Sequence, residues 1–399
     1  MPQEAWHDAT LCPICHRESC ENPAHRARGE RDQTPPPVFQ TAGELLTEAS
    51  PLDIVEGVAQ AGRLTALVSE SGAGKTFVLL NLAAAITSDV RWHDRDVLHG
   101  SVAYISYEGD ALGLRMRAIR DHQGHRLEHL YILRASEPIS PQVSHHDGEV
   151  RSLGELLVHA AIKSLVDHLA AAGKPPIRLV VIDTVRASMI GSEDSSEPVA
   201  AYLRVARRLL AEVPDAGGIL AHHAGWQDGE TQKKRERGSS AWRGNCDITL
   251  YLEAEEADRV RGEAGITLRV LKIRDGERPA DLALIRRQVE LSERTRKGDL
   301  VTSCIVDTDR RTPADKEAAT VARVDRAERP NDLKILRAMA DHPDLATSQE
   351  RLRLLLGIRR NTINDACARL LRKDWIRLPV KQRQPYAVTE AGQEALKSV

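Results

Sequence analysis

The chain has 399 residues, of which 41% are hydrophobic and only 3% aromatic, so we expect two or three domains with cores built from aliphatic side chains. Its formal net charge of −2 excludes a global basic field, and any contact with nucleic acid must come from local patches. No apolar stretch reaches the roughly 18 residues of a membrane span and the N-terminus lacks a signal-peptide pattern, so we expect a soluble, cytoplasmic protein without membrane contact.

The first 40 residues hold a cluster of cysteines followed by a proline-rich spacer. Cys12 and Cys15 have the two-residue gap that lets both thiolates face one ion. With Cys20 and His25 they complete a tetrahedral set for structural Zn²⁺, and His16 is the alternative to His25. The competing interpretation is a cysteine-containing tail without metal. Residues 1–40 are therefore predicted to be a zinc-knuckle-like segment and linker that contacts DNA or a partner.

From residue 41 to 295, short apolar runs alternate with segments of helical periodicity. The runs "RLTALVS", "VAYISYE", "LVVID" and "GGILAHH" predict buried strands. This alternation predicts an α/β domain with a mostly parallel sheet and helices on both faces. Three later runs, "DITLYLEA", "GITLRVLKIR" and "DLALIRRQVEL", are expected to add antiparallel strands at one edge.

The turn "SESGAGKT" joins the first of these strands to its helix. Its glycines let backbone N–H groups curl around phosphate oxygens, and the helix N-terminus favours the same anion. Lys75 can reach the β- and γ-phosphates and the Thr76 hydroxyl can hold Mg²⁺, although Ser69 stands where the usual motif has a glycine. We expect ATP and Mg²⁺ here. The residues expected to contact the nucleotide are Ser71, Gly72, Ala73, Gly74, Lys75, Thr76 and Phe77.

Two acidic side chains end neighbouring apolar runs. Asp183 closes "LVVID", where a carboxylate beside the phosphate turn can hold Mg²⁺ or its water shell. Glu108 closes "VAYISYE", where a carboxylate can orient or deprotonate the water that attacks the γ-phosphate. Asp110 is the rival for this role. The pattern predicts Thr76 and Asp183 as metal ligands and Glu108 as the base.

The C-terminal part is predicted to be a winged helix over residues 331–399, after a charged linker over residues 296–330. The charged stretch is expected to begin with the last edge of the sheet. Three amphipathic segments precede a short ribbon, "RLPVKQRQPYAVT", and a closing helix. Basic residues outnumber acidic ones between 351 and 383, which favours a nucleic-acid face. The residues expected to meet duplex DNA are Arg359, Arg360, Thr362 and Asn364. A winged helix used for protein contacts is the alternative.

Residues 41–291 resemble the RecA-like ATPases, and more closely the hexameric replicative helicases of the plasmid RepA and DnaB type. The stretches that carry the resemblance are "SESGAGKT", "VAYISYEGDALGLRMRAI", "LVVIDTVRASMIGSEDSSEPV" and "ILAHHAGW" with "RGSSAWRGNCDITLYLE". The last pairing, a polar strand end followed by a polar loop and an "RGS-A-RG--D" element, discriminates best. The resemblance implies the RecA-like fold and places the catalytic glutamate at the end of the second strand.

The resemblance also assigns roles to residues outside the phosphate turn. His223 falls at the family's γ-phosphate sensor, with His222 as the adjacent alternative. Lys272 and Arg274, in "LRVLKIRDGERP", match an element that reaches the neighbouring subunit's nucleotide site, where an arginine stabilises charge on the transferred group. An exposed basic strand is the competing interpretation of Lys272 and Arg274.

The loop over residues 227–240 contains Lys233, Lys234, Arg235 and Arg237. In the family, the corresponding segment faces a central channel and grips single-stranded DNA, which suits clustered cations. A merely solvated loop is the alternative. A nucleotide site completed by a neighbour also implies a homo-oligomer, and the family suggests a hexameric ring.

The sequence thus predicts an ATP hydrolase that acts as a DNA helicase or translocase in the replication of a plasmid, phage or mobile element. The main rival is a DNA-binding regulator or loader in which ATP switches oligomerisation and the winged helix binds duplex DNA. A recombinase that forms open filaments is a third interpretation.

Overall fold

A computed structural model of the chain describes residues 39, 41–47, 50–108, 111–144, 148–223, 242–258, 261–378 and 384–397. Residues 1–51 and 52–399 form two compact units. The described residues of the first unit include helix α2 (Ala42–Leu45). Across the described ranges, no helix is long and apolar enough to cross a membrane.

A nine-stranded sheet organises the second unit. In spatial order its strands are β13 (Leu300–Thr308), β12 (Leu282–Arg294), β11 (Glu263–Ile273), β10 (Ile248–Ala254), β3 (Leu64–Ser69), β9 (Gly217–His223), β8 (Ile177–Asp183), β4 (Ser101–Ser106) and β5 (Leu130–Arg134). The strands from β10 to β5 run parallel, and β11, β12 and β13 add antiparallel pairs. The predicted mixed, mostly parallel α/β sheet is confirmed.

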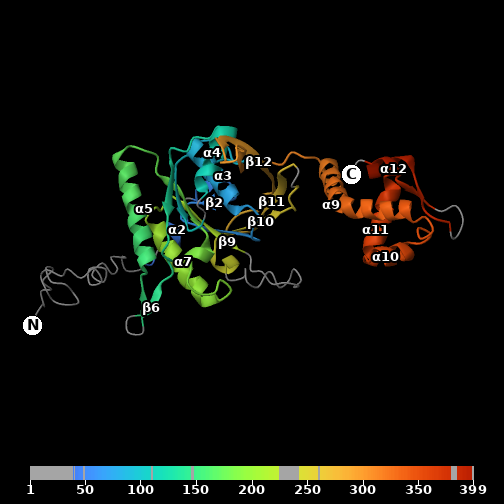
Figure 1. The fold of residues 1–399 in the computed structure, drawn as a ribbon. Coiled ribbons are helices and arrows are strands. Elements are labelled where there is room, and N and C mark those ends of the chain that lie inside the picture. Colours follow the sequence, from blue (N-terminus) through green and yellow to red (C-terminus); the bar gives the residue numbers. More distant parts are fainter. Residues whose placement is uncertain are drawn as a thin grey trace, which may run out of the picture. The chain divides into compact units, whose positions relative to one another are not determined.

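Helices cover both faces of this sheet (Figure 1). One face packs against α3 (Lys75–Ser88) and α4 (Leu112–Gln123). The other packs against α5 (Leu153–Ala171), α6 (Val185–Ser188) and α7 (Ser196–Ala211). Because side chains alternate along a strand, Leu67 of β3 faces α3 while Ala66 and Val68 face the other layer. The buried strand β3 thus joins two apolar cores.

The register brings the carboxyl ends of four strands to one edge of the sheet. Ser69 of β3 pairs with His223 of β9, and Ser106 of β4 pairs with Asp183 of β8. Parallel strands end on the same side, so the turn after β3 and the polar residues after β4, β8 and β9 meet there. The short ribbons β1 (Asp53–Val55) with β2 (Ala59–Gln60), and β6 (Gln142–Ser144) with β7 (Gly148–Val150), lie outside the main sheet.

Strand β10 differs from the antiparallel direction expected for it. It pairs in parallel with β3, with Ile248 opposite Thr65, and only its other neighbour β11 is antiparallel. The Asp247 N–H donates to the Leu64 carbonyl at 2.9 Å, and this hydrogen bond holds the start of β10 beside β3. The chain between β9 and β10 is long enough to return to the end of the sheet at which the parallel strands begin, as a parallel pairing requires.

The charged segment 296–330 contains the last edge strand of the sheet, as expected, and then a helix. Strand β13 continues the sheet because Ile305 and Val306 are buried. Helix α9 (Pro313–Asp341) then begins at a capping box, in which the Thr312 hydroxyl accepts from the Asp315 N–H at 3.1 Å. The helix continues through Pro330, since helix-favouring residues flank it on both sides. The edge strand was therefore expected, whereas the helix that follows it was not.

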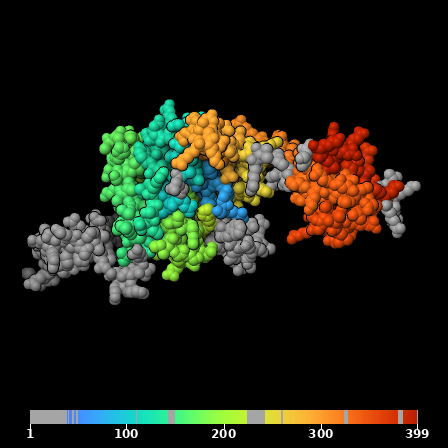
Figure 2. Space-filling view, viewed as in Figure 1, coloured from blue at the N-terminus to red at the C-terminus, as the bar shows by residue number. Residues whose placement is uncertain are grey.

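The C-terminal residues contain the expected order of helices, ribbon and closing helix. The second half of α9 packs with α10 (Gln349–Leu356), α11 (Arg360–Arg372), the ribbon β14 (Ile376–Arg377) with β15 (Ala387–Val388), and α12 (Glu390–Lys397). Figure 2 shows these residues, orange to red, as a compact group. The buried carboxylate of Asp332 on α9 accepts from Arg369 Nη2 on α11 at 2.8 Å, so a buried ion pair joins the first and third helices.

Candidate nucleotide site

The phosphate turn lies between β3 and α3, as the sequence predicts. Gly72 and Gly74 have φ angles of 78° and 99°, in the left-handed region that favours glycine. The helix begins at Lys75, so its free N–H groups point toward the turn. This combination of backbone donors and helix N-terminus forms a pocket suited to phosphate.

Lys75 is held by two side chains from neighbouring strand ends. Its Nζ donates to Ser69 Oγ at 2.9 Å and to His223 Nδ1 at 2.9 Å. Ser69, the departure from the usual motif, therefore supplies an acceptor for the lysine. Burial lowers the pKa of Lys75 to about 8, against the opposing effect of the carboxylates of Asp183, Glu108 and Glu193.

Thr76 and Asp183 meet directly. The Thr76 hydroxyl donates to Asp183 Oδ2 at 2.8 Å, and the buried Tyr104 hydroxyl donates to the same oxygen. Asp183 Oδ1 is buried and has no hydrogen-bond partner among the described residues. An unpartnered buried carboxylate oxygen beside a threonine hydroxyl fits Mg²⁺, which takes hard oxygen ligands. Tyr104 was not foreseen, because nothing in a buried strand marks one tyrosine as the partner of a carboxylate.

Glu108 follows the end of β4, as expected, and its side chain is exposed. Its Oε1 accepts a hydrogen bond from Thr184 Oγ1 at 2.8 Å, and its backbone carbonyl accepts one from Ser106 Oγ at 2.6 Å. The Tyr107 N–H donates to the Asp183 carbonyl at 2.7 Å. Glu108 is therefore anchored beside β8, the strand that ends in Asp183. Its rival Asp110 lies outside the described residues.

The two histidines that end β9 have different surroundings. His223 contacts Lys75, and burial, followed by the lysine charge, lowers its pKa. His222 is buried, and its ring centroid lies 4.7 Å from that of Trp242. Its Nε2 lies 2.9 Å from Glu193 Oε2, without the alignment of a hydrogen bond. Of the two, only His223 is in direct contact with the phosphate turn through a hydrogen bond.

Lys272 and Arg274 lie away from this site in their own chain. Ile273 pairs with Ile248, which pairs with Thr65 near the amino end of β3. Both cations therefore lie near the amino ends of the parallel strands, whereas Ser69 lies at the carboxyl end of β3. Lys272 Nζ donates to the carbonyls of Arg243 at 2.7 Å and Cys246 at 2.6 Å. Arg274 is half exposed and pairs with Asp247 at 3.0 Å. Neither cation can serve the phosphate turn of its own chain.

Two further arginines border the phosphate turn. The guanidinium of Arg115 on α4 lies 4.6 Å from the centroid of the Phe77 ring, and that of Arg286 on β12 lies 5.9 Å from it. Arg286 Nη1 also donates to the Gly72 carbonyl at 3.3 Å. These cations are close enough to contact a bound nucleotide. Sequence analysis missed Arg286 because no local motif links β12 to a turn more than 200 residues earlier.

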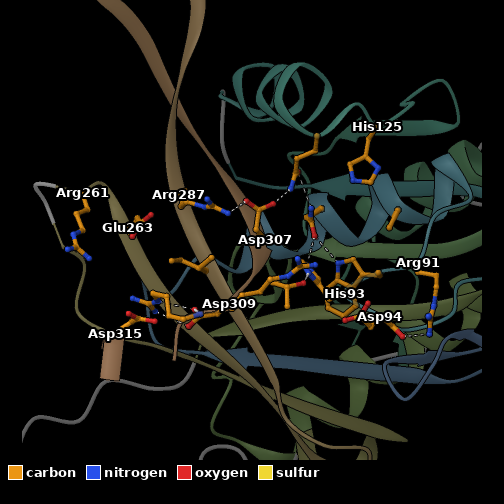
Figure 3. A pocket seen from close by; sticks show the side chains of 18 residues that line it. Arg91, His93, Asp94, His125, Arg261, Glu263, Arg287, Asp307, Asp309 and Asp315 are labelled. Atoms are coloured by element: carbon orange, nitrogen blue, oxygen red, sulfur yellow. Dashed lines mark hydrogen bonds and ion pairs between the residues drawn. The ribbon is translucent and has the colours of Figure 1, made fainter. Parts of the chain in front are cut away.

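A cavity of about 870 Å³ lies elsewhere, between α3, β12, β13 and the turn that carries His93 (Figure 3). None of its lining residues belongs to the phosphate turn or to the acidic strand ends. Arg287 Nη2 pairs with Asp307 Oδ2 at 2.5 Å, and Gln123 Nε2 donates to Asp307 Oδ1 at 2.8 Å. His93 is fixed between Thr308 and Asn81. These paired groups hold the antiparallel strands against α3, so the cavity is no part of the nucleotide site.

Several predicted site residues fall outside the described ranges. They are the zinc ligands Cys12, Cys15, Cys20 and His25 and the basic residues of the 227–240 loop, Lys233, Lys234, Arg235 and Arg237. The described residues contain no cluster of three or more histidine, cysteine or acidic side chains that could hold a metal ion. Zinc and the DNA loop therefore stay predictions.

Comparison with known families finds one match. Residues 31–229 match a family described as an AAA domain. The matched part contains the phosphate turn, Glu108, Asp183 and His223, and it ends before Lys272 and Arg274. A comparison with curated proteins finds no match.

Proposed function

We propose that this chain couples ATP hydrolysis to movement along single-stranded DNA as a hexameric helicase or translocase. The match of residues 31–229 to a family described as an AAA domain supports a P-loop ATPase of the RecA-like type. The observation that carries the proposal is the contact between Lys75 and His223. It joins the phosphate turn to the end of β9, the strand that leads into the basic loop at 227–240. Nucleotide state can therefore reach a segment whose charge suits a phosphate backbone.

The chemistry follows from side chains at one edge of the sheet. Lys75 and the backbone N–H groups of the turn would bind the phosphates, and Thr76 with Asp183 would hold Mg²⁺, which neutralises charge on them when bound. Glu108 would accept the proton of the attacking water through Oε2, since its Oε1 already accepts from Thr184.

The ring belongs to the proposal because Lys272 and Arg274, whose element resembles one that reaches a neighbouring site, lie away from the phosphate turn of their own chain. Arg274 lies at the opposite edge of its own sheet, so it would act on a neighbouring copy. A head-to-tail arrangement of copies meets this requirement and closes into a ring. We place the protein in the cytoplasm, in the replication of a plasmid, phage or mobile element.

A second candidate is an ATP-switched regulator or loader that works through the C-terminal residues, which we interpret as a winged helix. Arg359 and Arg360 are exposed at the start of α11. Exposed arginine side chains at the start of a third helix suit contacts with the backbone or bases of duplex DNA. The zinc-knuckle-like segment would add a further contact in either case.

ATPase rates without DNA, with single strands and with duplex test the two candidates. Wild type is compared with Glu108→Gln, with a loop variant (Lys233, Lys234, Arg235 and Arg237 to Ala) and with an α11 variant (Arg359 and Arg360 to Ala). A motor predicts strong stimulation by single strands that is lost in the loop variant and kept in the α11 variant. A flat ATPase rate, with ATP-dependent duplex binding lost in the α11 variant, would favour the regulator.

A further inference from the structure

Thr184 is a buried residue between β8 and a short helix. It follows Asp183 directly, precedes α6, and its exposed fraction is 3%. Its hydroxyl donates to Glu108 Oε1 at 2.8 Å. The contact joins residues 76 positions apart in the sequence and depends on the parallel pairing of β4 with β8.

The direction of this hydroxyl is unusual for its place. Thr184 occupies the N-cap of α6 with extended backbone angles, where a threonine oxygen ordinarily accepts from an N–H of the first turn. Here the side chain makes no cap hydrogen bond. At the start of the helix, the Thr184 carbonyl instead accepts a hydrogen bond from the Ser188 hydroxyl at 2.9 Å. The hydroxyl is thus used for Glu108 and not for the helix.

Glu108 depends on this contact for its orientation. Its side chain is exposed, and the described residues give it no second side-chain hydrogen bond. An ionised carboxylate only accepts hydrogen bonds, so Thr184 must be the donor. With Oε1 fixed, the carboxylate cannot rotate freely and Oε2 keeps one direction.

We propose that Thr184 is a positioning residue that orients the Glu108 carboxylate toward the attacking water. The inference rests on the proposed role of Glu108 as the base. A misplacement of about 1 Å in a catalytic group can cost about 100-fold in rate. Loss of the hydroxyl should therefore reduce turnover strongly while leaving nucleotide binding to the phosphate turn intact.

The test uses the full chain and isosteric substitutions. Thr184→Val removes the donor and keeps the shape, while Thr184→Ser keeps the donor. Thr249→Val is the matched control, because Thr249 on β10 is buried and its hydroxyl has no hydrogen-bond partner among the described residues. For each variant, single-turnover hydrolysis and the Kd for a non-hydrolysable ATP analogue are measured.

We expect Thr184→Val to lose about 10- to 100-fold in hydrolysis with an unchanged Kd, and Thr184→Ser and Thr249→Val to stay near wild type. In the Glu108→Gln background, Thr184→Val should add little, because the two side chains act as one unit. Full activity of Thr184→Val, an equal loss in Thr184→Ser, or additive losses in the double variant would overturn the proposal. Retained turnover in Glu108→Gln alone would instead overturn the role of Glu108 as base, on which the proposal rests.

Discussion

Lys75 Nζ lies 2.9 Å from His223 Nδ1, so the lysine of the phosphate turn and the polar end of β9 are bonded to each other. An ammonium group only donates hydrogen bonds, so Nδ1 is the acceptor and the neutral ring carries its proton on Nε2. A nucleotide that draws Lys75 to its phosphates must release His223. The hydrogen bonding of His223 therefore depends on whether nucleotide is bound.

Nucleotide affinity should fall as the pH rises through the pKa of Lys75, which is about 8. Bound phosphate favours the charged lysine, so the complex holds a proton that the free protein loses above this pH. We expect the Kd of an ATP analogue to increase by up to about tenfold for each pH unit above 8. Lys75→Arg stays charged over this range, so a parallel increase in that variant would refute the assignment.

His223→Ala should separate nucleotide binding from its consequences. Removing the ring frees Lys75 for phosphate, so we expect the analogue Kd to be unchanged or a few-fold lower. The response of the ATPase rate to single-stranded DNA should be lost. His159→Ala, which removes a histidine paired with Glu212 on the α5 side, is the control for both measurements. A large loss of binding in His223→Ala would mean that the ring shapes the turn itself.

Asp183→Asn should act mainly on the Mg²⁺ requirement. The substitution keeps the shape but removes the charge beside Thr76, and hydrogen bonding to Oδ2 can be retained. We expect the Mg²⁺ concentration at half-maximal turnover to rise by about tenfold or more, in the range seen when groups around a metal are altered. Tyr104→Phe removes only the bond to Oδ2 and should shift the Mg²⁺ titration much less. Equal titrations for wild type and Asp183→Asn would exclude Asp183 as a ligand.

Mixing two inactive variants tests whether Arg274 acts on a neighbouring copy. Arg274→Ala keeps its own phosphate turn, and Lys75→Ala keeps its own arginine. In rings assembled from equal amounts, about one quarter of the interfaces should combine an intact turn with an intact arginine. We expect activity to reappear after mixing, measured as ATP turnover against each variant alone. No recovery in verified mixed assemblies would leave Arg274 as a structural partner of Asp247.

His93 should make the fold less stable at acidic pH. Burial lowers the pKa of His93 from 6.5 to about 4, against the opposing effect of the carboxylates of Asp307 and Asp94. Below pH 6.5 the His93 side chain of the unfolded chain takes up a proton, whereas the same side chain in the folded chain stays neutral. The free energy of unfolding is therefore highest above pH 6.5 and falls toward pH 4. The loss attributable to His93 is at most about 3 kcal/mol. Urea unfolding at pH 7 and pH 4.5 should show a smaller difference for His93→Asn than for wild type.

The central sheet and the phosphate turn could be predicted because their signals are local. The run from Leu64 to Ser69 is apolar and fully buried, and the glycines and Lys75 follow it directly. The positions of Asp183 and Glu108 beside this turn could be predicted for the same reason, since Asp183 ends β8 and Glu108 closely follows β4. Residues whose role depends only on a neighbouring strand end are therefore visible in the sequence.

The remaining contacts depend on distant segments. Arg286 reaches the turn only because β12 folds back over β11, and Lys272 is committed to carbonyls on the segment before β10. The direction of β10 also depends on the length of the return before it and not on its own residues. The helix α9 was not foreseen within 296–330, because many of its residues are charged and this composition is also typical of a linker.

Asp183 and Thr184 are consecutive residues, so one peptide unit joins the carboxylate that we propose for the metal ion to the hydroxyl that we propose orients Glu108. Any slide of β8 along its axis shifts both by the same amount. The Asp183 carboxylate and the Thr184 hydroxyl therefore move together relative to the phosphate turn. An engineer who wanted to slow hydrolysis without weakening Mg²⁺ would have to alter the side chain at position 184 and leave the strand in place.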